Sequence, residues 1–330
     1  MAPLTVAVTG PTGTFGSALM PFLEDDDQIG RVVGVARSLF DPAARGWTKM
    51  TYRQGDVRRP EDLRAAFADA DVVVHLAFLI LGGAPETSHA INVEGTLNAF
   101  REAVAAGASR FVYASSIAAY GFHADNPVGM DEDWPTRPAD HLSYAQQKAD
   151  LEQLLAGEAA AHPEVEVYVL RPPIVLGPDT LGGKVTVPPQ LLGLLKQLRS
   201  LVSKVPFPVL VPDLPLQLVH QEDVARALHL CVVGAGPAGT YNIAADDLVT
   251  VADVAREVGV LPISVPRLPV SAAARLLVRT PGLPTMAQWL ETMTHPAVMD
   301  VSRAKDQLGW QPEHSALDSL RAALGDLPDD

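Results

Sequence analysis

Tyr144 and Lys148 are the two side chains whose types and spacing point most directly to chemistry. They stand four positions apart, which on a helix places both on one face and within reach of each other. An ammonium held near a phenol stabilises the phenolate and lowers its pKa from about 10, so the phenol can act as an acid or base near neutral pH. Because a Tyr-x-x-x-Lys spacing also arises by chance, this assignment needs support from elsewhere in the chain.

A pair of serines gives part of that support. Ser115 and Ser116 directly follow the apolar run Phe111–Ala114, which is typical of a buried strand. In a doubly wound sheet, ligands bind beyond the carboxyl ends of the strands. A serine hydroxyl at this place can hold a substrate carbonyl by a hydrogen bond while Tyr144 transfers the proton. Capping of the strand end is the simpler alternative for either serine.

A glycine-rich turn follows the first apolar run. The stretch Thr9–Gly16 contains the pattern G-x-x-G-x-x-G and leads into a segment with helical periodicity. Glycine lets the backbone turn tightly and approach a pyrophosphate, while the helix N-terminus offers N–H groups to the phosphates. Because the turn lies between a strand and a helix, it predicts dinucleotide binding rather than a structural loop. The residues predicted to bind the dinucleotide here are Gly10, Thr12, Gly13, Thr14, Phe15 and Gly16.

The end of the second apolar run bears on the type of dinucleotide. An acidic residue about 20 positions past the glycines would bind a ribose 2′-hydroxyl, but this run ends in Arg37 and Ser38. A guanidinium can pair with a 2′-phosphate, so we expect a preference for NADP(H), with NAD(H) as the alternative. Arg37 could instead be a solvated loop cation. Asp56, followed by Val57 after the third strand, is a candidate partner for the adenine edge.

The elements that must position these residues alternate along the first half of the chain. Runs that are apolar at consecutive positions suit strands buried on both faces, and alternation with helices makes those strands parallel. We therefore predict an α/β fold with a doubly wound parallel (Rossmann) sheet. The predicted strands are Thr5–Val8, Val32–Val35, Val72–Leu76, Phe111–Ala114 and Val165–Leu170, and the predicted helices are Gly16–Leu23, Glu61–Ala68, Val93–Ala106 and Tyr144–Ala161.

Prolines crowd the chain beyond Arg171, and the regular alternation ends there. Two apolar helices are expected in this part, at Gln190–Val202 and near Ala272–Leu277. Proline-punctuated insertions of this kind commonly cover the carboxyl edge of the sheet and contact the substrate. We predict a dinucleotide-binding domain of residues 1–175, to which residues 217–245 and about 291–304 return. A smaller, mostly C-terminal substrate-binding lobe would comprise residues 176–216, 246–290 and 305–330.

The chain of 330 residues is acidic, with a formal net charge of −14 and a pI near 5.0. No nucleic-acid partner is expected, because binding to a phosphate backbone depends on Lys and Arg. The single cysteine excludes an internal disulfide and a cysteine-ligated metal site. The chain starts without the pattern of a secretion signal, and its Val72–Leu81 run is far shorter than the about 20 residues of a membrane span. We expect a cytoplasmic protein with no membrane partner.

Landmarks along nearly the whole chain resemble the extended short-chain dehydrogenase/reductase family, in the group of NAD-dependent epimerase/dehydratase and 3β-hydroxysteroid dehydrogenase-like enzymes. They add further motifs to the glycine turn and to the serine, tyrosine and lysine positions. In chain order the landmarks are Thr9–Gly16, Gly55–Val57, His75–Ala77, Asn92–Thr96, Ser115-Ser116 with Tyr120-Gly121, Tyr144 with Lys148, Leu170–Pro172 with Gly177-Pro178, Val219-His220 with Asp223–Ala225, Tyr241–Ile243 and Asp300–Trp310.

The resemblance implies an enzyme and assigns roles to its site residues. Tyr144 would be the catalytic acid/base, Lys148 would bind the nicotinamide ribose and tune Tyr144, and Ser116 would orient the reacting oxygen. Ser116 is preferred to Ser115 because it stands four residues before Tyr120. The resemblance also implies that Leu76, Ala77 and Phe78 line the cofactor and that the stretch from Pro172 through Pro173 to Val175 passes the nicotinamide amide.

Several further expectations come from the resemblance. Asn92 matches an asparagine that organises the helix beside the active site, where a structural role is at least as plausible as a catalytic one. His75 and His220 fit buried strand or turn positions, so we expect no ligand role for either and no metal site. A homodimer is expected, built from the helices Val93–Ala106 and Tyr144–Ala161 packed as a four-helix bundle.

Leu216 bears on the substrate class. Members of the family that act on nucleotide sugars often carry an arginine four residues before the Val-His histidine, where this chain has Leu216. A sugar diphosphate would lack its usual clamp, and unpaired charge in a closed site is costly. Apolar neighbours would instead line a pocket, although about half of them could simply fill the core. The predicted substrate contacts are Phe78, Ser116, Ile117, Tyr144 and Pro173.

We therefore expect an NADP(H)-preferring oxidoreductase that interconverts a ketone and a secondary alcohol on a hydrophobic small molecule. The alternative is a nucleotide-sugar epimerase or dehydratase whose tightly held NAD(P) is reduced and reoxidised within one cycle. A second alternative is a catalytically silent NAD(P)-sensing binding protein. The presence of Ser116, Tyr144 and Lys148 disfavours this second alternative.

Overall fold

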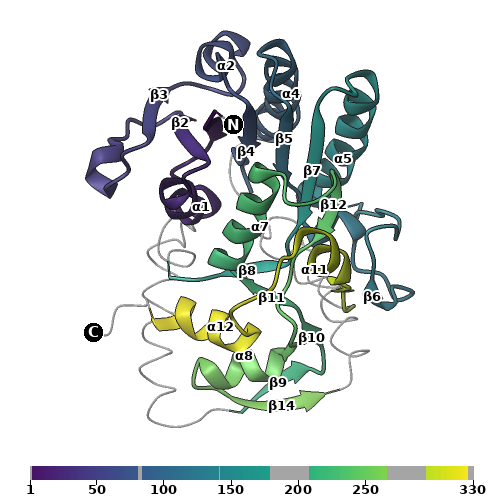
Figure 1. The fold of residues 1–330 in the computed structure, drawn as a ribbon. Helices are drawn as coiled ribbons and strands as arrows, with labels where there is room; N and C mark the ends of the chain where they lie inside the picture. Colours follow the sequence, from purple (N-terminus) through teal and green to yellow (C-terminus); the bar gives the residue numbers. More distant parts are fainter. Residues whose placement is uncertain (1, 81–83, 141, 179–207, 266–294, 326–330) are drawn as a thin grey trace.

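A computed structural model describes residues 2–80, 84–140, 142–178, 208–265 and 295–325 (Figure 1). Its centre is a sheet of seven parallel strands in the order β12-β7-β5-β4-β1-β2-β3. The order runs outwards in both directions from β1 and β4, which confirms the predicted doubly wound α/β fold. The strands are β1 (Leu4–Thr9), β2 (Ile29–Ala36), β3 (Met50–Gln54), β4 (Val72–His75), β5 (Arg110–Ala114), β7 (Glu166–Arg171) and β12 (Gly239–Asn242).

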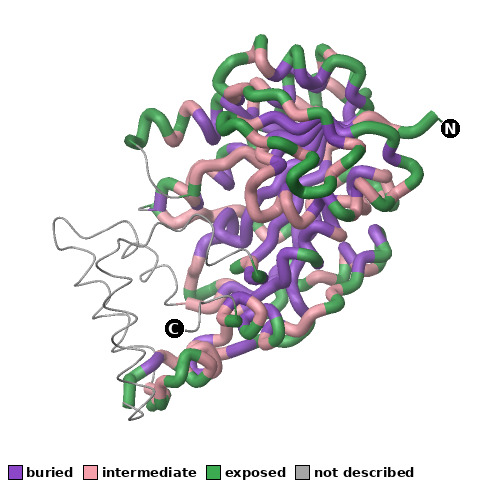
Figure 2. Tube along the Cα trace, turned by 90° about the vertical axis from the view of Figure 1, so that its left-hand side faces the viewer, coloured by how far each residue is buried: buried purple, intermediate pink, exposed green. Residues whose placement is uncertain are grey.

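Helices cover both faces of this sheet because its strands are apolar on both faces. In β1, Val6 and Val8 belong to one buried core, whereas Ala7 belongs to the other. The first core includes residues of α1, α7 and α11, and the second includes residues of α2, α4 and α5. Buried residues accordingly concentrate in the sheet in Figure 2. These helices are α1 (Thr14–Asp25), α2 (Pro60–Phe67), α4 (Gly95–Ala105), α5 (Ser143–Ala161), α7 (Gln221–Val233) and α11 (Ser302–Leu308).

The helix predicted at Val93–Ala106 has a more complex start than its periodicity indicates. A short helix α3 (Pro85–His89) continues into a π-helical turn at Ala90–Glu94, and α4 follows directly. Two further short helices, η1 (Pro42–Arg45) and η3 (Ile117–Tyr120), follow strands of the sheet. The helices predicted at Gln190–Val202 and near Ala272–Leu277 lie outside the described residues.

A smaller lobe lies beyond the carboxyl edge of the sheet, in the lower part of Figure 1. Its core contains Leu176, Leu218 and Val249 together with Ala316 and Leu320 of α12. Strands β8 and β11 pair with each other in parallel and do not join the main sheet. The elements of this part are β8 (Ile174–Leu176), β9 (Pro208–Pro212), β10 (Pro215–Leu216), β11 (Leu218–His220), β13 (Val249–Thr250), β14 (Leu261–Val265), α8 (Val251–Glu257) and α12 (Ala316–Gly325).

The chain returns to the main domain after residue 295. Strand β15 (Val298–Met299) pairs with β6 (Val128–Met130), and α11 follows. The predicted boundary at residue 304 is too early, because α11 runs to Leu308 and Trp310 is fully buried in a core of the main sheet. Residues 305–310 therefore pack with the dinucleotide-binding domain. None of the described helices is long and apolar enough to cross a membrane.

Candidate active site

A cavity of about 1020 Å³ follows the carboxyl ends of the sheet strands. The turn from Gly10 enters it after β1, Arg37 after β2, Asp56 after β3, Ser116 after β5 and Pro172 after β7. Parallel strands bring these separate segments to one edge, which is where this fold binds ligands. Every residue predicted to contact cofactor or substrate lines this cavity: Gly10, Thr12, Gly13, Thr14, Phe15, Gly16, Arg37, Ser38, Asp56, Val57, Leu76, Ala77, Phe78, Ser116, Ile117, Tyr144, Lys148, Pro172, Pro173 and Val175.

The glycine turn has no room for side chains at two positions. Gly10 has φ +71°, and a Cβ there would lie 3.1 Å from the backbone N of Ala77. A Cβ on Gly16 would lie 2.5 Å from the carbonyl oxygen of Gly10 and 2.5 Å from Cα of Pro11. No side chain caps α1, so its first N–H groups remain for a phosphate. The turn therefore fits the pyrophosphate of a dinucleotide.

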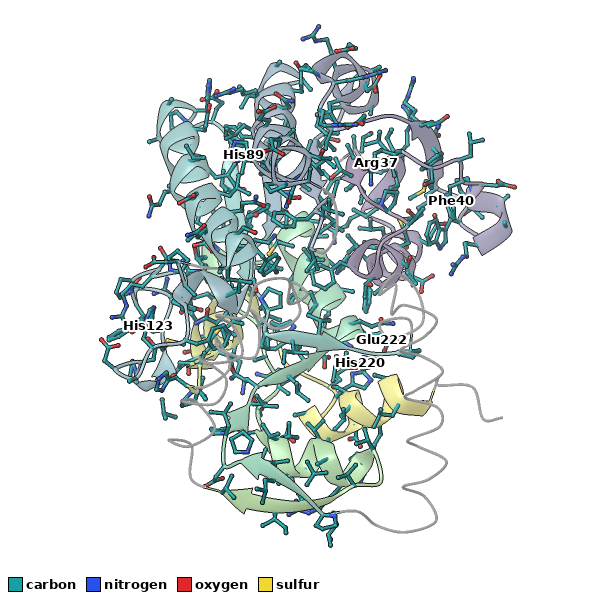
Figure 3. All side chains as sticks on the ribbon, turned by 180° about the vertical axis from the view of Figure 1, so that it is seen from behind. Arg37, Phe40, His89, His123, His220 and Glu222 are labelled. Atoms are coloured by element: carbon teal, nitrogen blue, oxygen red, sulfur yellow. The ribbon has the colours of Figure 1, made fainter. Side chains whose placement is uncertain are left out.

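Two arginines line the cavity near the end of β2. Arg37, which is labelled in Figure 3, directly follows β2, and Arg45 comes from η1. Sequence reasoning missed Arg45, because no motif marks it and only the turn after β2 brings it to the cavity. Asp56 lines the same end, where its hydrogen bond from Arg58 lowers the pKa of its carboxyl. The carboxylate predicted to meet adenine is thus ionised and already paired with Arg58.

Ser116 and Tyr144 meet at the centre of the cavity. Tyr144 is the second residue of α5, and its hydroxyl is hydrogen-bonded to the side chain of Ser116. The Ser116 hydroxyl oxygen also accepts the N–H of Ala118 at 3.2 Å, which caps η3. The neighbouring Ser115 instead donates its hydroxyl proton to Glu152. Of the two serines, Ser116 is thus the one that contacts Tyr144.

Lys148 lies one helical turn after Tyr144 but does not tune it as expected. Its Nζ donates to the Ala114 carbonyl oxygen at 2.6 Å and lies 3.5 Å from the centre of the Phe78 ring. Burial lowers the pKa of Lys148 to about 7, against the opposing effect of Glu152. Burial also raises the pKa of Tyr144, against the effect of its Ser116 hydrogen bond. The predicted lowering of the Tyr144 pKa is therefore not seen, because the ammonium is directed at Ala114 and is partly deprotonated near pH 7.

The opposite end of the cavity is lined mainly by apolar side chains, together with Gln217 and His295. Leu216, which stands at the position where an arginine would clamp a diphosphate, lines this end from β10. Among the described lining residues, the Arg and Lys side chains are Arg37, Arg45 and Lys148 alone. Sequence reasoning missed the wall formed by residues 295–297, because it arises from the pairing of β15 with β6. The apolar lining includes Phe78, Leu79, Ile117, Phe122, Leu214, Leu216, Pro296 and Ala297.

The side chains of His75 and Asn92 hold in place the chain segments that line the cavity. The two ring nitrogens of His75 bind the hydroxyl groups of Thr9 at 2.9 Å and Thr96 at 3.0 Å. The Asn92 amide binds both backbone groups of Leu79, and its nitrogen donates to the side-chain oxygen of Gln147 on α5 at 2.7 Å. Both residues therefore position the segments that line the cavity.

The chain is similar to one protein family and to several proteins, some of them uncharacterized. The family described as "NAD dependent epimerase/dehydratase family" matches residues 6–244. An uncharacterized protein of Mycobacterium tuberculosis is 27% identical over 96% of this chain and 82% of its own length. The UDP-glucose 4-epimerase of Vibrio cholerae is 24% identical over 97% of this chain and 94% of its own length. The ceramide reductase of Caulobacter vibrioides is 31% identical, but over only 68% of this chain and 59% of its own length.

Solved structures agree with the fold. The Bordetella bronchiseptica enzyme WbmG, in complex with NAD and UDP, superposes with a TM-score of 0.72 at 20% identity, covering 98% of this chain and 94% of its own. A UDP-glucose 4-epimerase from Thermotoga maritima, with UDP-glucose, has a TM-score of 0.72 at 19% identity, covering 98% of each chain. At such low identity these matches establish the architecture alone.

Proposed function

The chain belongs to the NAD dependent epimerase/dehydratase family, and on that premise we propose that it interconverts a ketone and a secondary alcohol on a hydrophobic small molecule with NAD(P)(H). The observation that carries this proposal is the hydrogen-bonded pair of Ser116 and Tyr144, set between the glycine turn and an apolar wall in one cavity. The residues at the glycine turn fit a dinucleotide, and the apolar wall fits a substrate without phosphate groups.

Tyr144 and Ser116 would handle the substrate oxygen. The Tyr144 hydroxyl gives its proton to that oxygen during reduction and recovers it during oxidation, while the Ser116 hydroxyl holds the oxygen by a hydrogen bond. The bound nicotinamide supplies or accepts the hydride. Lys148 carries a positive charge in part of the molecules near pH 7, at a position 5.9 Å from the centre of the Tyr144 ring.

Leu216 and the apolar wall support a hydrophobic substrate. No diphosphate clamp stands at Leu216, and the described cations of the cavity lie at the β2 end or beneath Tyr144. The likeness to a ceramide reductase agrees with an apolar substrate, although that alignment covers little more than half of the reductase.

A nucleotide-sugar epimerase or dehydratase is the second candidate. The comparisons favour it, because the family description names epimerases and dehydratases and both superposed structures contain a uridine nucleotide. In such an enzyme the cofactor is reduced and reoxidised within one turnover, so no net change in NAD(P)H follows. This property separates the two candidates in one experiment.

The test is to follow NAD(P)H absorbance with a panel of apolar ketones and, in parallel, product formation from UDP-sugars. Net cofactor oxidation by an apolar ketone is expected, and Tyr144→Phe should lower this rate by about 10²–10⁴-fold while the cofactor still binds. The control Tyr168→Phe removes a hydroxyl that donates to the backbone oxygen of Gly236, and neither residue lines the cavity. Turnover confined to the UDP-sugars would reject the first candidate in favour of the second.

We propose further that the cofactor is NADP(H) in preference to NAD(H). Arg37 and Arg45 both line the end of the cavity beyond β2, where a ribose 2′-phosphate would meet them. Arg37→Ala should weaken NADP⁺ binding by about tenfold or more and NAD⁺ binding little, as measured by titration calorimetry. The control Arg31→Ala removes an exposed arginine from the other end of β2. Equal affinities of the wild type for the two cofactors would contradict the preference.

A further inference from the structure

A second group of potential ligands lies at the junction of β11 and α7, outside the cofactor cavity. His220 ends β11, Glu222 stands in the first turn of α7, and His314 comes from the segment between α11 and α12. Figure 3 shows His220 and Glu222 close together at this junction. A ring nitrogen of each histidine and a carboxylate oxygen of Glu222 all lie within 4.8 Å of one another.

The distances within the group are close to those of a shared cation. One carboxylate oxygen of Glu222 lies 3.9 Å from Nδ1 of His220 and 3.6 Å from Nε2 of His314. Ligand atoms of a tetrahedral Zn²⁺ with bonds of about 2.0–2.1 Å stand about 3.3 Å apart. The Glu222 side chain is 52% exposed, so it can rotate. The rings of His220 and His314 stack with centroids 3.9 Å apart, so they must also turn apart for both lone pairs to point at one ion.

Asp223 holds His314 in a state suited to metal binding. It is fully buried, and it accepts the N–H of Glu313 at 2.9 Å and the N–H of His314 at 3.1 Å. Its carboxylate also lies 3.2 Å from Nδ1 of His314, which can donate to it. A carboxylate on one ring nitrogen fixes the tautomer and leaves a lone pair on the other, which is the common arrangement around metal-binding histidines. Nε2 of His314 is the nitrogen that faces Glu222.

His220 is equally constrained. Its ring is buried and stacks on that of His314, with centroids 3.9 Å apart. The Nδ1 atom now accepts only a long hydrogen bond of 3.3 Å from the N–H of Glu222.

We propose that His220, Glu222 and His314 bind one Zn²⁺ ion, which ties the segment before α12 to the start of α7. Two imidazoles and one carboxylate are borderline ligands that suit zinc, with a fourth position left for water. This inference departs from the sequence expectation that His220 has no ligand role. The signal was hidden because His314 stands 94 positions after His220 and only the fold brings them together.

The experiment uses the full chain without a polyhistidine tag, stripped with a chelator and titrated with Zn²⁺ against a chromophoric zinc indicator. One Zn²⁺ per chain is expected, and Co²⁺ in its place should give the visible absorption of a low-coordinate site. Glu222→Gln and His314→Gln should each weaken Zn²⁺ binding by about tenfold or more. Glu222→Gln is nearly isosteric at an exposed side chain, so the loss of a fold would not explain its result.

The matched control is His229→Gln. His229 also lies on α7, and its Nε2 stands 2.8 Å from Asp26, so it offers a competing histidine–carboxylate pair close by. This variant should bind Zn²⁺ as the wild type does. Zn²⁺ should also raise the melting temperature of the wild type and of His229→Gln more than that of Glu222→Gln. Absence of stoichiometric binding, unchanged binding in both site variants, or loss of binding in His229→Gln alone would overturn the proposal.

Discussion

His75 and Lys148 are both buried beneath the cavity, and their surroundings set their charges differently. His75 has hydroxyl partners on both ring nitrogens, and burial lowers its pKa to about 3, with a further lowering by Lys148. Lys148 lies over the Phe78 ring, and its pKa of about 7 leaves it divided between two charge states near neutrality. The charge of Lys148, which stands one helical turn after Tyr144, is therefore sensitive to small changes in pH.

His75 predicts a loss of stability in mild acid. In the unfolded chain its pKa is about 6.5, so between pH 6.5 and 3 the unfolded state binds a proton that the folded state does not. Stability therefore falls as pH falls through this range, by about 2 kcal/mol from this residue between pH 7 and 5. Urea unfolding at both pH values should show a smaller loss for His75→Gln than for the wild type. His162→Gln serves as a control at a half-buried histidine and should keep the wild-type loss.

At the scale of elements, the turn between β1 and α1 has no space for an added methyl group at Gly16. Gly16→Ala places a methyl group 2.5 Å from two backbone atoms, so the turn or the helix must shift. We expect cofactor affinity to fall by at least about tenfold and stability to fall by about 1–3 kcal/mol. Gly157→Ala in α5 is the matched control, because nothing lies within 4 Å of its Cβ. Calorimetric titration with NAD(P)⁺ measures the affinity of each variant for the cofactor. Equal affinities of Gly16→Ala and Gly157→Ala would contradict the prediction.

The strands and helices of the main sheet, and the glycine turn of the site, could be predicted because each is marked by a local sequence pattern. Strand periodicity, helix periodicity and the glycine turn are local patterns, and parallel packing then brings their ends together. The cavity wall at residues 295–297 and the proposed ligand His314 depend on contacts between distant segments, which leave no local pattern. The direction of the Lys148 ammonium also escaped prediction, because it follows from the Ala114 carbonyl beneath it.

At the scale of the whole molecule, α4 and α5 remain the predicted surface for a second copy of the chain. Arg101 of α4 pairs with Glu158 of α5, so the two helices form one continuous face. Leu154 of α5 is 42% exposed on the monomer. Light scattering with size exclusion should give twice the 35.1 kDa mass of one chain. A mass of one chain for the wild type would reject the dimer.

Substitution of Leu154 tests whether the dimer forms through α4 and α5 or through another surface. Leu154→Arg should shift the mass towards that of one chain, because a charge would be buried without a partner in the four-helix bundle. Leu39→Arg is the control, since Leu39 is 84% exposed beyond the end of β2, away from α4 and α5. Equal masses for the two variants would place the interface elsewhere.

The return of the chain at β15 also sets an order of events during synthesis. The main sheet is complete once β12 has left the ribosome at Asn242, whereas the wall at residues 295–297 emerges later. The Asn242 amide donates to the carbonyl oxygens of Met130 and Asp300. The second of these hydrogen bonds at the end of β12 can form only after Asp300 has been synthesised. A growing chain can thus form the edge that we propose binds the dinucleotide before the wall at residues 295–297 exists. Cofactor that binds at this stage would stabilise the partly synthesised chain while the remaining residues are translated.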